Sequence, residues 1–274
     1  EVHYMKRTNG TWGSVEVVAT HATSGQVEPQ IAVGPSAVHV IWAGSGWGVN
    51  SGNINIHYKQ KTEAGWQAQE DVTDVARSQR VPILALDSAE NVHIIWLDYA
   101  GGGVEEVEYR KRESGTWGAQ TTLKSSSGGT QNHSIAIDKD NGIHVVYSYI
   151  ETNYFIGYRY NSGGSWASEE ILDSGGGSSV YMGGMLWARY PSVNILAASD
   201  QPVLVYQRAD EDDLWIYKAS MPDYFLSFLG ENIYYQDLDN TKEIHVILHN
   251  LSPTSKPAGT NGQVVIEFVY EPVA

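Results

Sequence analysis

The chain has 274 residues, no cysteine, and 17 basic against 32 acidic side chains, which gives a formal net charge of −15. This charge repels phosphate backbones and anionic lipids, so nucleic-acid and membrane roles are disfavoured, and no apolar run is long enough for a membrane helix. The lack of cysteine excludes disulfides, thiol nucleophiles and cysteine-based metal sites. Abundant glycine, together with many Val, Ile, Tyr and Trp residues, favours an all-β fold.

Two kinds of segment alternate along the chain with a period of about 50 residues. The first kind has a strand with a tyrosine, a turn with glycine and tryptophan, and a second strand, as in VHYMKRTNGTWGSVEVV from Val2. Further copies start at Ile54, Val107 and Phe155, and a weaker one surrounds Tyr217. A tryptophan at the same place in each of the four full copies predicts a structural wedge between neighbouring sheets. These tryptophans are Trp12, Trp66, Trp117 and Trp166.

The second kind of segment is a pair of strands joined by a tight polar turn, as in PILALDSAENVHIIWLD from Pro82. The other copies start at Pro29, His133 and Pro191. The second strand of a pair reads VHVIW, VHIIW or IHVVY, and such a continuous apolar run is typical of a sheet that is buried on both faces. Its histidines are predicted to be buried, neutral and hydrogen-bonded to a neighbouring sheet rather than metal ligands. They are His39, His93 and His144.

Four antiparallel strands in each repeat are typical of a β-propeller blade. We therefore predict a propeller of about five four-stranded blades, with residues 1–220 as the propeller repeats. The N-terminal strands lack two partners, and Ile244–Ile247 echoes the strand at Val38–Ile41, so we expect residues 231–250 to complete a blade with residues 1–20. The alternative is that residues 221–274 form a separate small β module for assembly.

The repeated segment P-x-I-A-x-D-x-x-x-x-V-H-V-x-W, followed by the tyrosine strand and the glycine and tryptophan turn, resembles the repeats of the sialidase-like superfamily of β-propellers. That superfamily includes sialidases, polysaccharide lyases and lectins. The resemblance covers roughly residues 1–220 and implies the propeller fold. The turns RTNGTW, TEAGW, RESGTW and NSGGSW do not match the sialidase Asp-box, and no spacing matches the sialidase arginine triad. The resemblance therefore implies a fold and not sialidase activity.

One face of a propeller carries the loops between blades and the loops that join the second and third strands of a blade. These loops are long and variable here, so we expect binding residues on this face. Aromatic rings stack on sugar rings while charged groups bond sugar hydroxyls, which predicts carbohydrate binding, with padding between blades as the alternative role of any one ring. The candidate ligand-binding residues are Trp47, Arg77, Arg80, Asp98, Tyr99, His133, Tyr149, Glu151, Tyr181, Trp187, Arg189 and Arg208.

Catalysis and metal binding are the remaining candidate chemistries. A glycoside hydrolase needs two carboxyl groups about 5 to 9.5 Å apart, for which Glu28, Asp98 and Glu151 are the candidates. A polysaccharide lyase would use a tyrosine and a histidine as base and acid. We expect no cofactor, and the acidic loop near residue 210 is predicted to be solvated, with Ca²⁺ binding as the alternative. The Ca²⁺ ligands would be Asp210, Asp212 and Asp213.

The sequence thus favours a non-catalytic propeller that recognises a glycan or a surface receptor, in an extracellular or a cell- or virion-surface setting. Two alternatives stay open: a hydrolase or lyase that acts on polysaccharide, and a structural propeller in a larger complex. Single sugar sites are weak, so we also expect homo-oligomers, or a larger assembly through the C-terminal strands, to raise avidity.

Overall fold

The computed structural model describes residues 1–151, 153–174, 189–196, 201–207 and 214–218. Within these ranges the chain is all-β and contains no helix, as predicted. The same residues accordingly include no helix that is long and apolar enough to cross a membrane. The predicted C-terminal segment, residues 221–274, lies outside the described residues.

Three copies of the repeat form antiparallel sheets with the same strand order. Sheet I contains β5 (Gln26–Val33), β6 (Val38–Gly44), β7 (Asn55–Thr62), β8 (Gly65–Trp66) and β9 (Glu70–Asp71). Sheet II contains β10 (Gln79–Leu86), β11 (Val92–Gly101), β12 (Val104–Glu113), β13 (Thr116–Trp117) and β14 (Thr121–Ser126). Sheet III contains β15 (Thr130–Ile137), β16 (Ile143–Ile150), β17 (Tyr154–Ser162), β18 (Ser165–Trp166) and β19 (Glu170–Ser174). In each sheet two short strands share the outermost position, so the predicted four-stranded repeat is confirmed for these three copies.

Incomplete repeats lie at both ends of the described chain. At the start, β1 (Val2–Tyr4) pairs with β4 (Glu16–Ala19), and β2 (Arg7–Thr8) pairs with β3 (Thr11–Trp12). At the end, β20 (Arg189–Leu196), β21 (Gln201–Gln207) and β22 (Leu214–Lys218) form a three-stranded sheet. Both ends therefore follow the strand pattern that the repeats predict.

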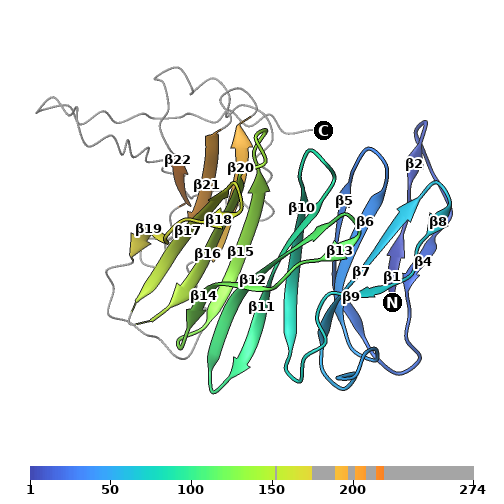
Figure 1. Cartoon of the computed structure of the whole chain (residues 1–274), viewed down its shortest axis with the longest axis horizontal. Coiled ribbons are helices and arrows are strands. Elements are labelled where there is room, and N and C mark those ends of the chain that lie inside the picture. The colour runs from blue at the N-terminus through green and yellow to red at the C-terminus, as the bar shows by residue number, and fades with distance from the viewer. Residues whose placement is uncertain (152, 175–188, 197–200, 208–213, 219–274) are drawn as a thin grey trace, which may run out of the picture.

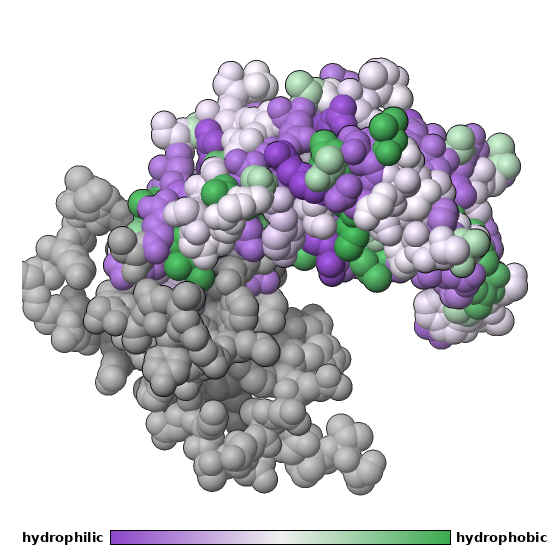
Figure 2. Space-filling view, turned by 90° about the horizontal axis from the view of Figure 1, so that it is seen from below, coloured by the Kyte–Doolittle hydropathy of each residue, from purple (hydrophilic) through white to green (hydrophobic). Residues whose placement is uncertain are grey.

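The sheets follow one another along an arc (Figure 1). Their innermost strands β5, β10, β15 and β20 lie next to one another in that order, as the inner strands of propeller blades do. The space-filling view shows that the described part of the molecule curves in one direction (Figure 2). The described residues form an open arc of sheets, and the predicted closed ring of five blades is not seen in them.

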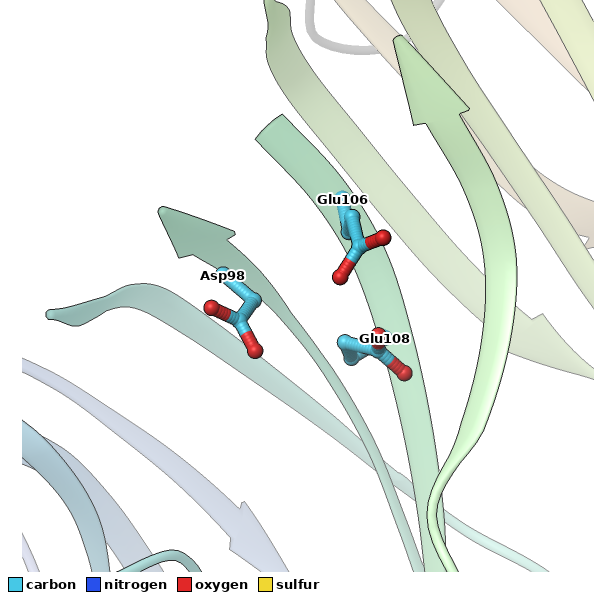
Figure 3. Close-up of side chains that lie close together, drawn as sticks. All are labelled: Asp98, Glu106 and Glu108. Carbon is cyan, nitrogen blue, oxygen red and sulfur yellow. The ribbon is translucent and has the colours of Figure 1, made fainter. Parts of the chain in front are cut away.

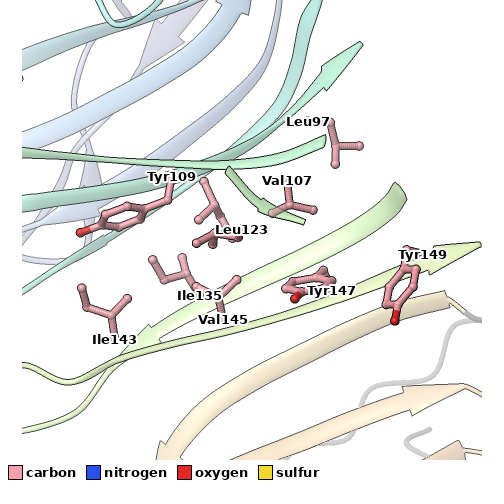
Figure 4. Packing of buried hydrophobic residues seen from close by; sticks show 10 residues of the cluster. Leu97, Val107, Tyr109, Leu123, Ile135, Ile143, Val145, Tyr147 and Tyr149 are labelled. Carbon is pink, nitrogen blue, oxygen red and sulfur yellow. The ribbon is translucent and has the colours of Figure 1, made fainter. Parts of the chain in front are cut away.

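Sheet II is buried on both faces, which explains the continuous apolar run of β11. Ile94 and Trp96 pack in the cluster with sheet I, whereas Ile95 and Leu97 pack in the cluster with sheet III, which Figure 4 shows with Leu97 labelled. All four side chains are at most 2% exposed. Because side chains alternate between the faces of a strand, this pattern also turns the next polar residue, Asp98, toward sheet I.

The turn tryptophans connect successive sheets, as predicted. Trp117 of sheet II packs edge-on against Tyr58 of sheet I, with 5.5 Å between ring centroids, and its Nε1 donates to Glu70 at 2.8 Å. The same edge-on contact with a tyrosine of the preceding repeat is made by Trp66 and Trp166. Trp12, at the start of the arc, is 61% exposed.

The strand histidines are buried and hydrogen-bonded, but their tyrosine partners lie in their own sheets. His39 Nδ1 is 2.7 Å from the Tyr58 hydroxyl in sheet I, and His93 Nδ1 is 2.8 Å from the Tyr109 hydroxyl in sheet II. His144 repeats the arrangement in sheet III. Nδ1 bonds within its own sheet because the tyrosine lies diagonally opposite on the adjacent strand. The predicted bond to a neighbouring sheet is present for His39, whose Nε2 is 3.3 Å from Glu90 Oε1 of sheet II, whereas His93 Nε2 is 3.2 Å from Asp87 of its own sheet. Burial lowers the pKa of His39 and of His93, which keeps both rings neutral at neutral pH.

Candidate functional site

Sheets I and II bring several predicted site residues together at one end, where β9 leads into β10. We call this end the loop edge. Arg77, in the loop before β10, donates from Nε to Asp98 Oδ2 at 2.8 Å, and its Nη2 is 2.6 Å from the same oxygen. The Arg77 side chain is 40% exposed, whereas Asp98 is fully buried near the end of β11. The guanidinium thus covers a buried carboxylate from the solvent side.

Asp98 belongs to a cluster of three carboxyl groups. The strand register places Glu106 directly opposite Asp98 and places Glu108 opposite Trp96. All three acidic side chains therefore lie on the face of sheet II that is turned toward sheet I. One carboxylate oxygen from each residue lies within 4.8 Å of the other two (Figure 3). We call Asp98, Glu106 and Glu108 the carboxylate cluster.

Burial controls the electrostatics of this cluster. Glu108 is 1% exposed, and burial raises the pKa of its carboxyl group to about 7, although the Thr122 hydroxyl donates to it at 2.7 Å. The charges of Glu106 and Asp98 add to that shift. Asp98 Oδ1 and Glu108 Oε2 are buried without a hydrogen-bond partner. Since buried carboxylate oxygens need a donor or a counter-charge, the cluster has unused capacity to accept a proton or a cation.

The carboxylate cluster is not part of the repeating scaffold. The place of Asp98 is taken by Gly44 in sheet I and by Tyr149 in sheet III. The places of Glu106 and Glu108 are taken by Asn55 and His57 in sheet I and by Phe155 and Gly157 in sheet III. Scaffold positions recur in a repeat protein, so acidic side chains confined to one repeat indicate a local role.

Asp98 is predicted as a site residue from the sequence, whereas Glu106 and Glu108 are not. Their signal is present in the sequence. If the repeats are aligned on their tyrosines, Glu106 and Glu108 of VEEVEY take the positions that Asn55 and His57 occupy in sheet I. Sequence patterning alone treats such polar residues as a solvated face, and only the pairing register shows that they meet Asp98.

A second ion pair and an exposed ring also lie at the loop edge. Arg80 Nη2 is 2.6 Å from Glu28 Oε1, and the Val81 backbone N–H donates to the other Glu28 oxygen at 2.7 Å. Glu28 and Val81 both have positive φ, 55° and 52°, at the irregular register of β5 and β10. Tyr99 of β11 is 40% exposed. Burial raises the pKa of Tyr99, the negative charges of Glu105 and Glu28 add to that rise, and the positive charge of Arg80 opposes it.

Tyr149 and Glu151 belong to a different group, between sheets II and III. Lys124 Nζ lies 3.5 Å from the centroid of the Tyr149 ring, 3.3 Å from Glu151 and 3.1 Å from Glu169. Tyr149 is 2% exposed and stacks on Phe155 at 5.1 Å. Glu151 is thus paired with a lysine, while each of the other two predicted catalytic carboxylates is paired with an arginine.

His133 and Trp47 are packed against neighbouring elements. His133 is 4% exposed, and its Nε2 donates to the Val81 carbonyl of sheet II at 2.8 Å. Trp47 lies in the loop after β6, where its ring centroid is 4.9 Å from that of His57 and 6.4 Å from that of Trp42. Both side chains therefore have contacts that a structural role would explain.

The remaining predicted site residues cannot be placed. Arg189 begins β20, but its side chain lies outside the described part of the structure. The other predictions that fall outside the described residues are Tyr181, Trp187, Arg208, Asp210, Asp212 and Asp213.

Comparison with known proteins supports the fold but shows no family. No family model and no curated protein matches the chain. A solved structure of a Dyadobacter fermentans protein of unknown function matches with a TM-score of 0.52 and 10% identity, over 74% of this chain and 68% of that chain. An ulvan lyase, described as a new family of polysaccharide lyase, matches with a TM-score of 0.50 and 10% identity, over 79% of this chain and 58% of that chain. At this identity the matches support the β-propeller fold and no particular activity.

Proposed function

We propose that this chain is a carbohydrate-recognition propeller that binds glycans at the loop edge of sheets I and II. The supporting observation is the exposed ring of Tyr99, which lies near the ion pair of Arg80 with Glu28, while the ion pair of Arg77 with Asp98 lies at the same end of sheet II. An aromatic ring stacks on the apolar face of a sugar, while arginine and carboxylate groups bond its hydroxyls. Because the ion pairs already hold these side chains in place, less conformational entropy is lost on binding.

The charge at this edge favours neutral sugars. Arg77 and Arg80 are engaged with carboxylates, and the surrounding acidic groups outnumber them. The whole chain carries a net charge of −15, which repels uronate and sulfate groups. We therefore expect a neutral polysaccharide, in contrast to the -[GlcA(1-4)Rha3S]- fragment bound to the ulvan lyase.

Substitution of Tyr99 tests this proposal. Tyr99→Ala should weaken binding of a neutral polysaccharide about tenfold, because it removes the stacking surface, whereas Tyr99→Phe should retain most of the affinity. The measurement is affinity electrophoresis with a panel of neutral and acidic polysaccharides, followed by calorimetry on the best ligand. Tyr160→Ala is the matched control, since Tyr160 pairs with His144 toward the opposite end of sheet III. Binding that is equally reduced by both substitutions, or no binding to any polysaccharide, would contradict the proposal.

An enzyme that acts on polysaccharide is the second candidate function. The carboxylate cluster supports it, because it brings three carboxyl groups together, with one oxygen of each within 4.8 Å of the others, just below the separation of about 5 Å in retaining hydrolases. Burial of Asp98 and Glu108 counts against direct contact with a sugar and leaves Glu106 as the accessible member. Release of reducing or unsaturated ends that is lost in Glu106→Gln would favour the enzyme over the binding module.

We also propose that the ring closes, with residues 231–250 completing the first repeat. In the other repeats the turn tryptophan packs against the tyrosine of the preceding repeat. Closure would bring the repeat that contains Tyr217 against β1 to β4, where it would cover the exposed Trp12 in the same way. Trp12→Ala should then destabilise the full chain about as much as Trp117→Ala, by about 3 kcal/mol, as measured by urea denaturation. A change within about 0.5 kcal/mol would instead favour a separate C-terminal module.

A further inference from the structure

The carboxylate cluster has the ligand set and the geometry of a cation site. Oxygens of Asp98, Glu106 and Glu108 lie within 4.8 Å of one another, so a point between them is at most about 2.8 Å from each oxygen. Small side-chain rotations would bring all three oxygens to the Ca²⁺ to oxygen distance of about 2.4 Å. We propose that these three residues bind one divalent cation of the calcium type between sheets I and II. This cation site shares Asp98 with the proposed sugar site, but cation binding does not require that any sugar is bound.

The charges support a divalent ion. The cluster contains three carboxyl groups, and among the described residues it pairs with the cation Arg77, whose Nη2 is 2.6 Å from Asp98 and 4.0 Å from Glu106. With all three groups ionised, the local charge is −3 + 1 = −2, which one Ca²⁺ would neutralise.

Two unpartnered oxygens supply an independent observation. Asp98 is 0% exposed and Glu108 is 1% exposed, yet Asp98 Oδ1 and Glu108 Oε2 accept no hydrogen bond. Figure 3 shows both carboxyl groups on the same side of β11 and β12, close to Glu106. Nearly all buried polar atoms in folded proteins have a partner, so two orphaned oxygens in one cluster point to a ligand between them.

The ligand chemistry selects the type of ion. The cluster contains carboxylate oxygens and neither histidine nor cysteine, so it suits hard cations rather than zinc or copper. Ca²⁺ accepts irregular sets of six to eight oxygens, and water could supply the remainder through the side where Glu106 is 20% exposed. Mg²⁺ usually keeps several waters and takes only one or two carboxylates, so three carboxyl groups in one cluster suit Ca²⁺ better.

Terbium luminescence tests the site without any sugar. Tb³⁺ replaces Ca²⁺ at oxygen sites and emits when a nearby tryptophan is excited, and Trp96 is directly opposite Glu108 in the register. In the full chain we expect emission that saturates at one ion per chain and is displaced by Ca²⁺. Asp98→Asn and Glu108→Gln should each weaken Ca²⁺ binding about tenfold or more, because each removes a charged ligand. Glu113→Gln, a control with the same charge change at the other end of β12, should bind like the wild type.

Thermal unfolding separates a lost ligand from a damaged fold. Saturating Ca²⁺ should raise the Tm of the wild type by about 5 °C, through preferential binding to the folded chain. Glu106→Gln should unfold at or above the wild-type Tm in a chelator, because it relieves repulsion in the cluster, and below the wild-type Tm in Ca²⁺. This reversal of order would not arise from misfolding. Absence of Ca²⁺ binding by calorimetry at millimolar concentrations, together with equal Tm values in Ca²⁺ and in chelator, would overturn the proposal whether or not Tyr99 binds sugar.

Discussion

Replacement of Trp96 by alanine should destabilise the protein by about 3 to 5 kcal/mol, the range for loss of a large aromatic side chain from a core. Trp96 is 0% exposed and packs in the cluster of buried residues that joins sheets I and II. Its Nε1 donates to the Gln79 side chain, which is also 0% exposed. The substitution therefore leaves a cavity between two sheets and an unpaired buried amide oxygen, and the two costs add.

Urea denaturation followed by circular dichroism measures this loss at pH 7. Trp96→Phe should cost clearly less than Trp96→Ala, because most of the ring volume remains. Val49→Ala is the surface control, since Val49 is 92% exposed, and it should change stability by no more than about 0.5 kcal/mol. A loss of less than about 1.5 kcal/mol for Trp96→Ala would show that sheets I and II do not depend on this interface.

The repeats made most of the described fold predictable. The spacing of Tyr58 and Tyr109 and of their turn tryptophans located the strands, and the apolar run of β11 indicated a sheet that is covered on both faces. Both signals are local, because consecutive residues determine the alternation of side chains along a strand and the type of a tight turn. Ring closure is different, since it depends on contacts between the two ends of the chain, which no local pattern encodes.

The candidate site was predictable only in part, and the reason is pairing. Arg77, Asp98 and Tyr99 were selected from their loop positions, and they do lie at one edge. The sequence could not show that Asp98 meets Glu106 and Glu108, because that contact depends on the register between β11 and β12. Likewise the partner of Glu28 is Arg80, 52 residues away on the next sheet, and composition alone does not indicate which charge it faces.

His133 should make stability fall as the solution becomes mildly acidic. Burial lowers the pKa of His133 to about 4, although the hydrogen bond to the Val81 carbonyl acts in the opposite direction. In the unfolded chain the same imidazole has a pKa of about 6.5. Between these values the unfolded state binds a proton that the folded state does not. The free energy of unfolding is therefore highest above pH 6.5 and decreases as the pH falls toward 4. The expected loss from this residue is about 2 kcal/mol between pH 7 and pH 5.

His133→Gln isolates this effect, because the glutamine amide can still donate to the Val81 carbonyl but does not titrate. Urea denaturation of both proteins at pH 7 and at pH 5 gives the four free energies of unfolding. His39 and His93 also make the protein less stable in acid, since burial lowers the pKa of each. Both residues are present in both proteins, so their effects cancel in the difference. The wild type should therefore lose about 2 kcal/mol more than His133→Gln over this pH interval. Equal losses would mean that His133 is accessible to protons in the folded chain, which is what a ligand-binding role at the loop edge would require.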